Sequence, residues 1–276
     1  MVIRELIADL TGQLNDNALY EAQELVMSVL GISNTELVLN RNREVSENDK
    51  TAVYEKLLRR KKGEPLQYIT GTAGFMGLEF KVTPDVLIPR ADTETLAEEI
   101  ISIADGCAKL LDIGTGSGCI GISVAHFKPD TEVTFLDISK KALEIAKYNA
   151  KKNNVNGIFV NMDILKEYPK ERFDIIVSNP PYICDYVIKD LQTEVKDYEP
   201  YGALSGGADG LLFYRRITEI APGMLNENGI LAYEIGCDQG EAVSELMRKS
   251  FCNVRVLKDL CGNDRVIIGE MKMRRS

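Results

Sequence analysis

Hydrophobic residues recur at helical spacing along the first part of the chain. Residues 2–14 and 19–30 each carry apolar side chains at the spacing of one helix face, and Gly31 marks the end of the second run. A further helix is expected after Ser46, which is placed to act as its N-cap because Asp49 follows near the third helical position. The pattern predicts that the chain begins with a small helical domain.

The pattern changes after Gly63, where glycines and prolines become frequent. Within this stretch, residues 78–82 alternate between apolar and charged side chains, which indicates a strand. We therefore expect residues 72–89 to form a β-hairpin connector between a helical domain at residues 1–71 and a second domain at residues 90–276.

The second domain is predicted to be α/β, because short apolar runs alternate with helical patterns. A helix capped by Asp92 or Thr93 opens it, and no element is predicted between residue 178 and a helix that starts near Asp209. Seven runs have the composition of strands: 109–113, 132–137, 157–162, 173–178, 230–235, 254–258 and 266–271. This alternation predicts a Rossmann-like, doubly wound parallel sheet of seven strands. The last two strands are joined by the short turn at 262–264 and must be antiparallel.

The composition excludes several kinds of site. The 276 residues include 33 Lys and Arg, 42 Asp and Glu and a single histidine, His126, so the formal net charge is −9. One histidine cannot build a multi-histidine metal centre, and no metal is expected. An acidic chain also lacks the basic surface that dominates duplex DNA binding, so no direct nucleic-acid partner is expected.

The cysteines and the apolar runs indicate a cytoplasmic protein with reduced thiols and no membrane contact. No two of the six cysteines have Cys-x-x-Cys spacing. Glu5 and Asp9 interrupt what would be the apolar part of a secretory signal. No uncharged run approaches the roughly 18–20 residues that span a bilayer. The basic run Arg59–Lys62 suits either a helix C-terminus or a docking patch for an anionic partner.

A glycine cluster indicates a nucleotide site. Gly114-Thr115-Gly116-Ser117-Gly118 follows a predicted strand and opens a helix, so backbone N–H groups can approach a ligand closely. Residues 116–121 also match the dinucleotide fingerprint G-x-G-x-x-G, which keeps NAD open as a ligand.

Two acidic residues at the ends of the next strands refine this site. Asp137 lies 19 residues beyond Gly118, where a carboxylate can accept from both ribose hydroxyls of an adenosine, which argues against NADP. Asp163 is placed to accept from the adenine amine, with Ile164 packing against the ring. The first carboxylate fits NAD and S-adenosylmethionine equally, and the second modestly favours S-adenosylmethionine.

The tetrapeptide Asn179-Pro180-Pro181-Tyr182 follows the buried run 173–178, at a predicted strand C-terminus. Proline has no N–H, so this loop offers mainly acceptors: backbone carbonyls and the Asn179 side-chain oxygen. Such acceptors can hold both N–H groups of a planar nitrogen and aim its lone pair at a methyl donor. The leaving group of that donor is a neutral thioether, so the transfer depends on positioning more than on a titrating base.

Asn-Pro-Pro-Tyr in this position resembles the motif of methyltransferases that act on the adenine amine or on the glutamine amide. Together with other segments, it makes the whole chain similar to the peptide chain release factor glutamine N5-methyltransferases, the HemK/PrmC family. The further matching segments are 63–71, 86–94 (with Ala91 where the family usually has proline), 198–200, 203–211, 234–236 with Gln239, and 259–265.

The resemblance implies transfer of a methyl group from S-adenosyl-L-methionine, giving S-adenosyl-L-homocysteine. It implies that the acceptor is the Gly-Gly-Gln glutamine of class 1 release factors, and that residues 1–71 dock the release factor. The implied cofactor-binding residues are Gly114, Thr115, Gly116, Ser117, Gly118, Asp137, Asp163, Ile164 and Asn179. The implied substrate-binding residues are Asn179, Pro180, Pro181, Tyr182, Arg90 and Glu94, and those with a catalytic role are Asn179, Pro180 and Tyr182.

Three other functions are compatible with parts of the pattern. An adenine-N6 methyltransferase acting on DNA or RNA would use the same tetrapeptide but would have to hold a polyanion, which the net charge of −9 disfavours. A non-catalytic S-adenosylmethionine-binding translation factor would not need an intact tetrapeptide. An NAD dehydrogenase would have no use for it.

Overall fold

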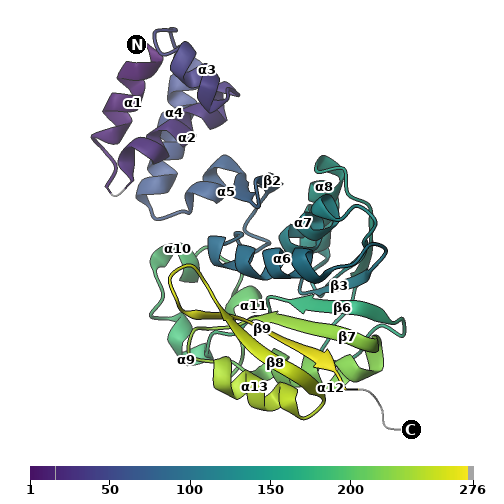
Figure 1. The fold of residues 1–276 in the computed structure, drawn as a ribbon. Helices are drawn as coiled ribbons and strands as arrows, with labels where there is room; N and C mark the ends of the chain where they lie inside the picture. Colours follow the sequence, from purple (N-terminus) through teal and green to yellow (C-terminus); the bar gives the residue numbers. More distant parts are fainter. Residues whose placement is uncertain (16, 273–276) are drawn as a thin grey trace. The chain divides into compact units, whose positions relative to one another are not determined.

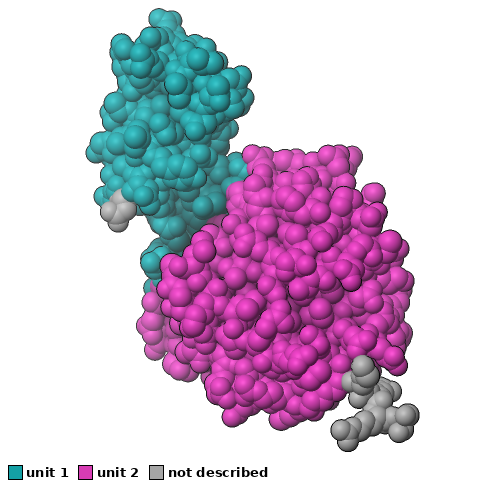
Figure 2. All heavy atoms as spheres, viewed as in Figure 1, with its two compact units in different colours: residues 1–72, 192–198 teal, residues 73–191, 199–276 magenta. Residues whose placement is uncertain are grey.

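A computed structural model describes residues 1–15 and 17–272, and the chain divides into two compact units (Figure 2). Unit 1 comprises Met1–Thr72 and Gln192–Tyr198, and unit 2 comprises the remainder. Residues 273–276, the end of the predicted second domain, lie outside the described residues. The docking role predicted for residues 1–71 stays a prediction.

Unit 1 is helical, as the periodicity predicts. Its helices are α1 (Ile3–Thr11), α2 (Ala18–Leu30), α3 (Asn34–Leu39), α4 (Glu47–Lys61), α5 (Leu66–Thr70) and α10 (Thr193–Lys196). Ser46 caps α4 by accepting from the Asp49 backbone N–H, and Gly31 ends α2 in the left-handed conformation. Helices α1 to α5 share one apolar core, which includes Leu6, Leu25 and Leu57.

Unit 1 also contains a segment from much later in the chain, and the reason is Arg60. Its guanidinium donates twice to the Glu21 carboxylate, at 2.8 Å each, and once to Glu194 at 2.7 Å. The Tyr198 hydroxyl donates to the Lys62 carbonyl. A half-buried arginine bound by two carboxylates stabilises the fold, and Arg59 pairs with Glu64, so two of the four charges in the basic run Arg59–Lys62 are already paired within the protein.

Unit 2 contains the predicted Rossmann-like sheet (Figure 1). Seven strands lie in the order β5-β4-β3-β6-β7-β9-β8, parallel except that β9 runs antiparallel to both neighbours. The strands are β3 (Lys109–Ile113), β4 (Glu132–Asp137), β5 (Gly157–Asn161), β6 (Phe173–Ser178), β7 (Leu225–Glu234), β8 (Phe251–Lys258) and β9 (Asp264–Met271). The predicted fold class, with its antiparallel terminal hairpin, is confirmed.

Helices cover both faces of this sheet, so unit 2 has three layers (Figure 1). One face packs against α6 (Ala91–Ile103), α7 (Cys119–Phe127) and α8 (Lys140–Lys152). The other packs against α12 (Leu212–Met224) and α13 (Gly240–Arg248). A separate two-stranded sheet, β1 (Thr72–Phe75) with β2 (Leu78–Lys81), precedes α6.

Several boundaries differ from the prediction for local reasons. Helix α6 begins at Ala91 after Arg90, and neither Asp92 nor Thr93 caps it, because both side chains make contacts elsewhere in unit 2. Strands β7 and β8 begin earlier than predicted, since β-bulges near their starts interrupt the alternation. The stretch predicted to be irregular contains three four-residue helices, α9 (Asp185–Ile188), α10 and α11 (Tyr201–Leu204).

The strand order predicts the place of a ligand site. From β3 the chain builds outward through β4 to β5 and then returns to place β6 on the other side of β3. Open α/β sheets bind ligands at such a switch point, beyond the carboxyl ends of the strands. Ile113 pairs with Ser178 in the register of β3 and β6, so the glycine cluster and the tetrapeptide emerge side by side.

Candidate active site

A cavity of about 580 Å³ lies beyond the carboxyl ends of β3, β4 and β6, entirely within unit 2. This volume is in the range of small-molecule sites. Most of the predicted site residues line it: Arg90, Gly114, Thr115, Gly116, Ser117, Asp137, Asp163, Ile164, Asn179, Pro180 and Pro181. Gly118, Tyr182 and Glu94 are not among the lining residues. The fold therefore collects residues that lie up to 91 positions apart (181 − 90) around one space.

The glycine loop after β3 is held by backbone hydrogen bonds to Leu136 in β4 and by two buried carboxylates, Asp112 and Asp137. Asp112 accepts from the Thr115 hydroxyl at 2.6 Å and from the Gly121 N–H at 3.2 Å, and burial raises its pKa to about 6. Gly118 has φ +83°, and an added Cβ would lie 2.7 Å from Ile122 Cδ1. A side chain at this position would disrupt the start of α7.

Asp137 ends β4 with its carboxylate oriented by backbone amides. Oδ2 accepts from the Gly116 N–H at 2.9 Å and Oδ1 accepts from the Ser139 N–H at 2.8 Å. Burial raises the pKa of Asp137 above its ordinary value, although these hydrogen bonds oppose the shift. Asp137 lines the cavity, and each of its carboxylate oxygens can accept a further hydrogen bond from a ligand there.

Asp163 and Ile164 follow β5 at the same edge of the sheet. Asp163 accepts from the Leu165 N–H at 3.1 Å and forms an ion pair with Lys166 at 2.9 Å, which lowers its pKa. Ile164 is buried in the core beneath α12 and also borders the cavity. The pair thus presents an acceptor beside an apolar surface.

The tetrapeptide is anchored at its first residue. The Ser178 hydroxyl donates to the Ile113 carbonyl at 2.7 Å, which ties the end of β6 to the end of β3. The Asn179 side-chain nitrogen donates to Glu234 Oε2 at 2.9 Å and to Thr93 Oγ1 at 3.3 Å. The donors of the Asn179 amide are therefore used within the protein, and its carbonyl oxygen, Oδ1, is available as an acceptor.

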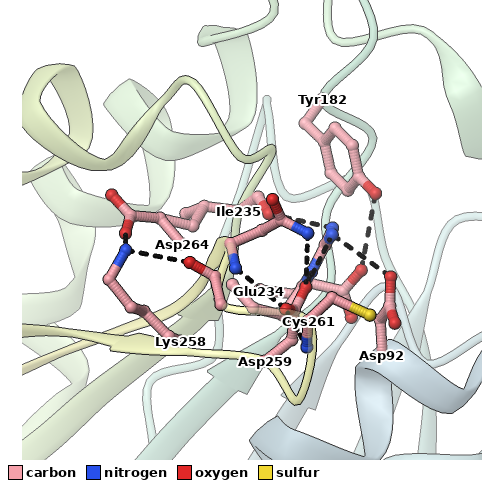
Figure 3. A network of polar contacts seen from close by, with 11 residues as sticks. Asp92, Tyr182, Glu234, Ile235, Lys258, Asp259, Cys261 and Asp264 are labelled. Atoms are coloured by element: carbon pink, nitrogen blue, oxygen red, sulfur yellow. Dashed lines mark hydrogen bonds and ion pairs between the residues drawn. The ribbon is translucent and has the colours of Figure 1, made fainter.

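Glu234, the last residue of β7, belongs to the site although the sequence pattern gave it no role. Its side chain is 2% exposed, and burial raises its pKa to about 7, while the Thr93 hydroxyl and Arg265 lower it. The Tyr182 hydroxyl lies 3.5 Å from Glu234 Oε1 (Figure 3). The sequence offered two signals, its place near the end of a predicted buried strand and the resemblance of segment 234–236 to the family, but neither assigned it a role.

Two segments later in the chain hold the backbone that follows the tetrapeptide. The Gln239 side chain donates to the Tyr182 carbonyl at 3.1 Å, and the Gly206 N–H donates to the Ile183 carbonyl at 2.8 Å. A Cβ on Gly206 would lie 2.8 Å from both the Pro181 carbonyl oxygen and Tyr182 Cα. The backbone of this loop must therefore pass close to the tetrapeptide, and the segment 203–211 is part of its support.

The two residues at the start of α6 that are predicted to bind substrate, Arg90 and Glu94, have different surroundings. Arg90 borders the cavity and forms an ion pair with the buried Glu199 at 2.6 Å. Glu94 instead accepts from the Met76 backbone N–H at 2.6 Å, in the β1–β2 turn. Glu94 braces the hairpin, and Arg90 lies where a ligand could reach it.

Three further features bear on the chemistry. Over the part of the chain that the structure describes, no three His, Cys, Asp or Glu side chains are grouped to hold a metal ion. All six cysteines are unpaired. No helix within residues 1–15 and 17–272 has the length and apolar character needed to cross a bilayer.

Comparison with known proteins assigns the chain to a family. Residues 91–194 match the Methyltransferase small domain, and residues 2–71 match the PrmC N-terminal domain. The crystal structure of a methyltransferase from Pyrococcus furiosus superposes with a TM-score of 0.55 at 21% identity, covering 82% of this chain and 98% of that one.

Two curated relatives have the same name, release factor glutamine methyltransferase. The protein from Geobacter sulfurreducens is 41% identical over 93% of this chain and 90% of its own length. The protein from Clostridium acetobutylicum is 40% identical over 93% of both chains. These matches do not favour the adenine alternative, and they show that this chain belongs to the family of release factor glutamine methyltransferases.

Proposed function

We propose that this enzyme transfers a methyl group from S-adenosyl-L-methionine to the side-chain amide nitrogen, N5, of the glutamine in the Gly-Gly-Gln motif of class 1 release factors. The observation that carries the proposal is the orientation of Asn179. Its N–H groups are bound to Glu234 and Thr93, so its carbonyl oxygen is free to accept from a planar amide. Family membership supports the same acceptor.

The residues of the cavity fit the proposed methyl donor. The glycine loop Gly114–Gly118 would hold the methionine part, the Asp137 carboxylate would accept from the ribose hydroxyls, and Asp163 with Ile164 would hold adenine. The donor set is suitable, because a backbone loop, a carboxylate and an apolar surface beside an acceptor line one cavity of about 580 Å³. When bound, S-adenosylmethionine supplies an electrophilic methyl group with a neutral leaving group.

The tetrapeptide would orient the substrate amide. Asn179 Oδ1 and the Pro180 carbonyl would accept its two N–H bonds, which directs the nitrogen lone pair out of the amide plane toward the glycine loop. Pro181 and Tyr182 would pack against the flat amide, and Arg90 would line the entry. Orientation of this kind is worth roughly 7–11 kcal/mol in favourable cases.

None of these residues needs to act as a strong base before transfer. Burial raises the pKa of the Tyr182 phenol, so Tyr182 stays neutral and serves as a packing surface. Once the nitrogen has gained the methyl group it becomes strongly acidic, and water can remove the proton. The catalytic contribution of the protein is therefore positioning and the alignment of acceptor dipoles.

The helical unit is proposed to bind the body of the release factor. A Gly-Gly-Gln tip alone offers little area, whereas standard specific interfaces bury about 1,600 Å². Residues 1–71 would supply that additional surface. Because translation termination takes place in the cytoplasm, we place the enzyme there as well.

One incubation tests the proposal. The purified enzyme is mixed with methyl-labelled S-adenosylmethionine and, in separate tubes, a class 1 release factor, the same factor with its tip glutamine changed to alanine, and DNA. We expect label only in the unchanged release factor. Label in DNA alone, or label that persists without the tip glutamine, would overturn the proposed function.

A further inference from the structure

The Asn179 side-chain amide can exchange its oxygen and nitrogen by a 180° rotation, and the two orientations occupy the same space. Only one of them presents an acceptor to the cavity. In the observed orientation its nitrogen donates to Glu234 Oε2 at 2.9 Å and to Thr93 Oγ1 at 3.3 Å. Rotation by 180° would place the Asn179 oxygen against the Glu234 carboxylate and turn two donors toward the substrate. A substrate amide that also donates could not bind to them.

Glu234 is itself held in place from several directions. The Tyr214 hydroxyl donates to the Glu234 backbone carbonyl at 2.8 Å. Arg265 provides a positive charge near the carboxylate, and it forms ion pairs with Asp92 at 3.1 Å and Asp259 at 3.2 Å (Figure 3). The carboxyl group is thus buried and oriented, and when ionised it can only accept.

The turn between β8 and β9 completes this support. Asp259 accepts from the backbone N–H groups of Cys261 and Asn263, each at 2.9 Å, and from the Arg265 side chain. The Arg265 guanidinium also donates to the Ile235 carbonyl at 3.5 Å, directly after β7 (Figure 3). The segment 259–265, matched to the family by sequence alone, therefore has a physical role: it holds the charge that faces Glu234.

We propose that Glu234 is a positioning residue, whose ionised carboxylate forces Asn179 to turn its carbonyl oxygen toward the methyl acceptor. The inference rests on the function proposed above. Glu234 does not touch the substrate and exchanges no proton with it. It acts by excluding the orientation of Asn179 in which the acceptor would become a donor.

Protonation of Glu234 links turnover to pH. A protonated Glu234 can donate as well as accept, so it no longer excludes the rotated Asn179 amide, and turnover should fall below a pH of about 7. The titratable and charged groups around Glu234 come from five elements: Asp92 on α6, Cys119 on α7, Tyr182 after β6, Tyr214 on α12 and Arg265 on β9. Burial raises the pKa of Cys119, Tyr182 and Tyr214, so none of these three loses its proton near neutrality.

The experiment compares Glu234→Gln with the wild-type enzyme. Glutamine keeps the shape but carries an NH2 group, so it tolerates both orientations of Asn179. We measure kcat at saturating release factor and cofactor from pH 5.5 to 9, together with the Kd of S-adenosylmethionine. Glu241→Gln is the matched control, because Glu241 is an exposed glutamate on α13 that pairs only with Arg248 among the contacts of the described residues.

The expected result is a fall in kcat of about tenfold or more at pH 8, a cofactor Kd within about twofold of wild type, and loss of the acid limb near pH 7. The control should match the wild type throughout. A Glu234→Gln enzyme with wild-type kcat and an unchanged acid limb would overturn the inference. Failure of the proposed function is recognised separately, because the wild-type enzyme would then leave the release factor unlabelled.

A second variant keeps the inference testable if Glu234→Gln folds poorly. Thr93→Val removes the other group that accepts from the Asn179 nitrogen and nearly preserves side-chain volume. We expect kcat to fall about threefold to tenfold, with the cofactor Kd unchanged. If Thr93→Val retains full kcat and the wild-type enzyme shows no acid limb near pH 7, the positioning role of Glu234 is rejected even where Glu234→Gln fails to fold.

Discussion

At the glycine loop the groups that face the cavity are held by backbone amides, whereas at the tetrapeptide they are held by side chains. Asp137 accepts from two backbone N–H groups close to it in the chain or in the adjoining loop. Asn179 depends on Glu234 and Thr93, which lie 55 and 86 positions away. One half of the site is therefore built locally, and the other is assembled by the fold.

This difference predicts which half controls which step. A loop of backbone amides suits the ligand that all methyltransferases of this fold would share, namely the methyl donor. Side-chain acceptors suit the group that distinguishes one methyltransferase from another. Substitutions at the tetrapeptide should therefore change turnover, and substitutions at the glycine loop should change cofactor affinity.

The largest effect is expected for Asn179→Ala. Loss of Oδ1 removes an acceptor from the substrate amide, and kcat should fall by more than about 100-fold while the cofactor Kd changes less. Steady-state methylation of a release factor and calorimetric binding of S-adenosylmethionine measure the two quantities. Near-normal turnover in this variant would show that Asn179 is not an acceptor for the substrate.

A smaller effect is expected for Gly206→Ala, which leaves the tetrapeptide intact but displaces it. Its Cβ would lie 2.8 Å from the Pro181 carbonyl oxygen, so the backbone must shift. We expect kcat to fall about tenfold to 100-fold, since displacements near 1 Å can have that effect. Gly74→Ala is the control, because a Cβ there meets no atom within 4 Å. Equal kcat in the two variants would contradict the supporting role of the loop.

The complementary effect is expected for Asp137→Asn in the other half. Replacing a charged acceptor by a neutral one should raise the cofactor Kd about tenfold, corresponding to roughly 1.5 kcal/mol. kcat at saturating cofactor should stay within about threefold of wild type. Asp105→Asn, on the exposed loop before β3, serves as the control. If Asp137→Asn lowered kcat and left the cofactor Kd unchanged, the assignment of cofactor affinity to this half of the site would be wrong.

The same contrast explains what the sequence could predict. The glycine loop and Asn-Pro-Pro-Tyr are each a continuous segment that follows a strand, so both could be located without a structure. The seven strands and the longer helices between them could be located in the same way. Glu234 could not be assigned a role, because its partner Asn179 becomes a neighbour only through the β6–β7 pairing. The association of Glu194 with Arg60 joins residues 134 positions apart and has no local pattern either.

Short elements escaped prediction for a related reason. Helices α9, α10 and α11 have four residues each, which is too few to show a 3.6-residue period. The start of α6 was misplaced because Asp92 and Thr93 look like caps, whereas their side chains bond to Arg265 and to Asn179. At the start of α6, tertiary contacts that are absent from the local sequence therefore decide the structure.

The smallest expected effect concerns stability, and it separates a functional carboxylate from a structural one. Burial raises the pKa of Glu234 from 4.5 to about 7, so between these values the folded state binds more protons than the unfolded chain. The free energy of unfolding therefore falls as pH rises through this window. Glu234→Gln removes that loss, and we expect its Tm to exceed the wild-type Tm by a few degrees at pH 8 and to match it at pH 5.

Differential scanning calorimetry at the two pH values measures this difference, with Glu241→Gln expected to melt like the wild type at both. A variant that melts higher and turns over more slowly would show that the Glu234 carboxylate destabilises the fold and is needed for the reaction. If Glu234→Gln instead melted several degrees below wild type at pH 8, the carboxylate would be a structural support. The Glu234 side chain would then hold the tetrapeptide half of the site together by stabilising the fold. The difference between this half and the glycine loop would concern stability and not the orientation of the methyl acceptor.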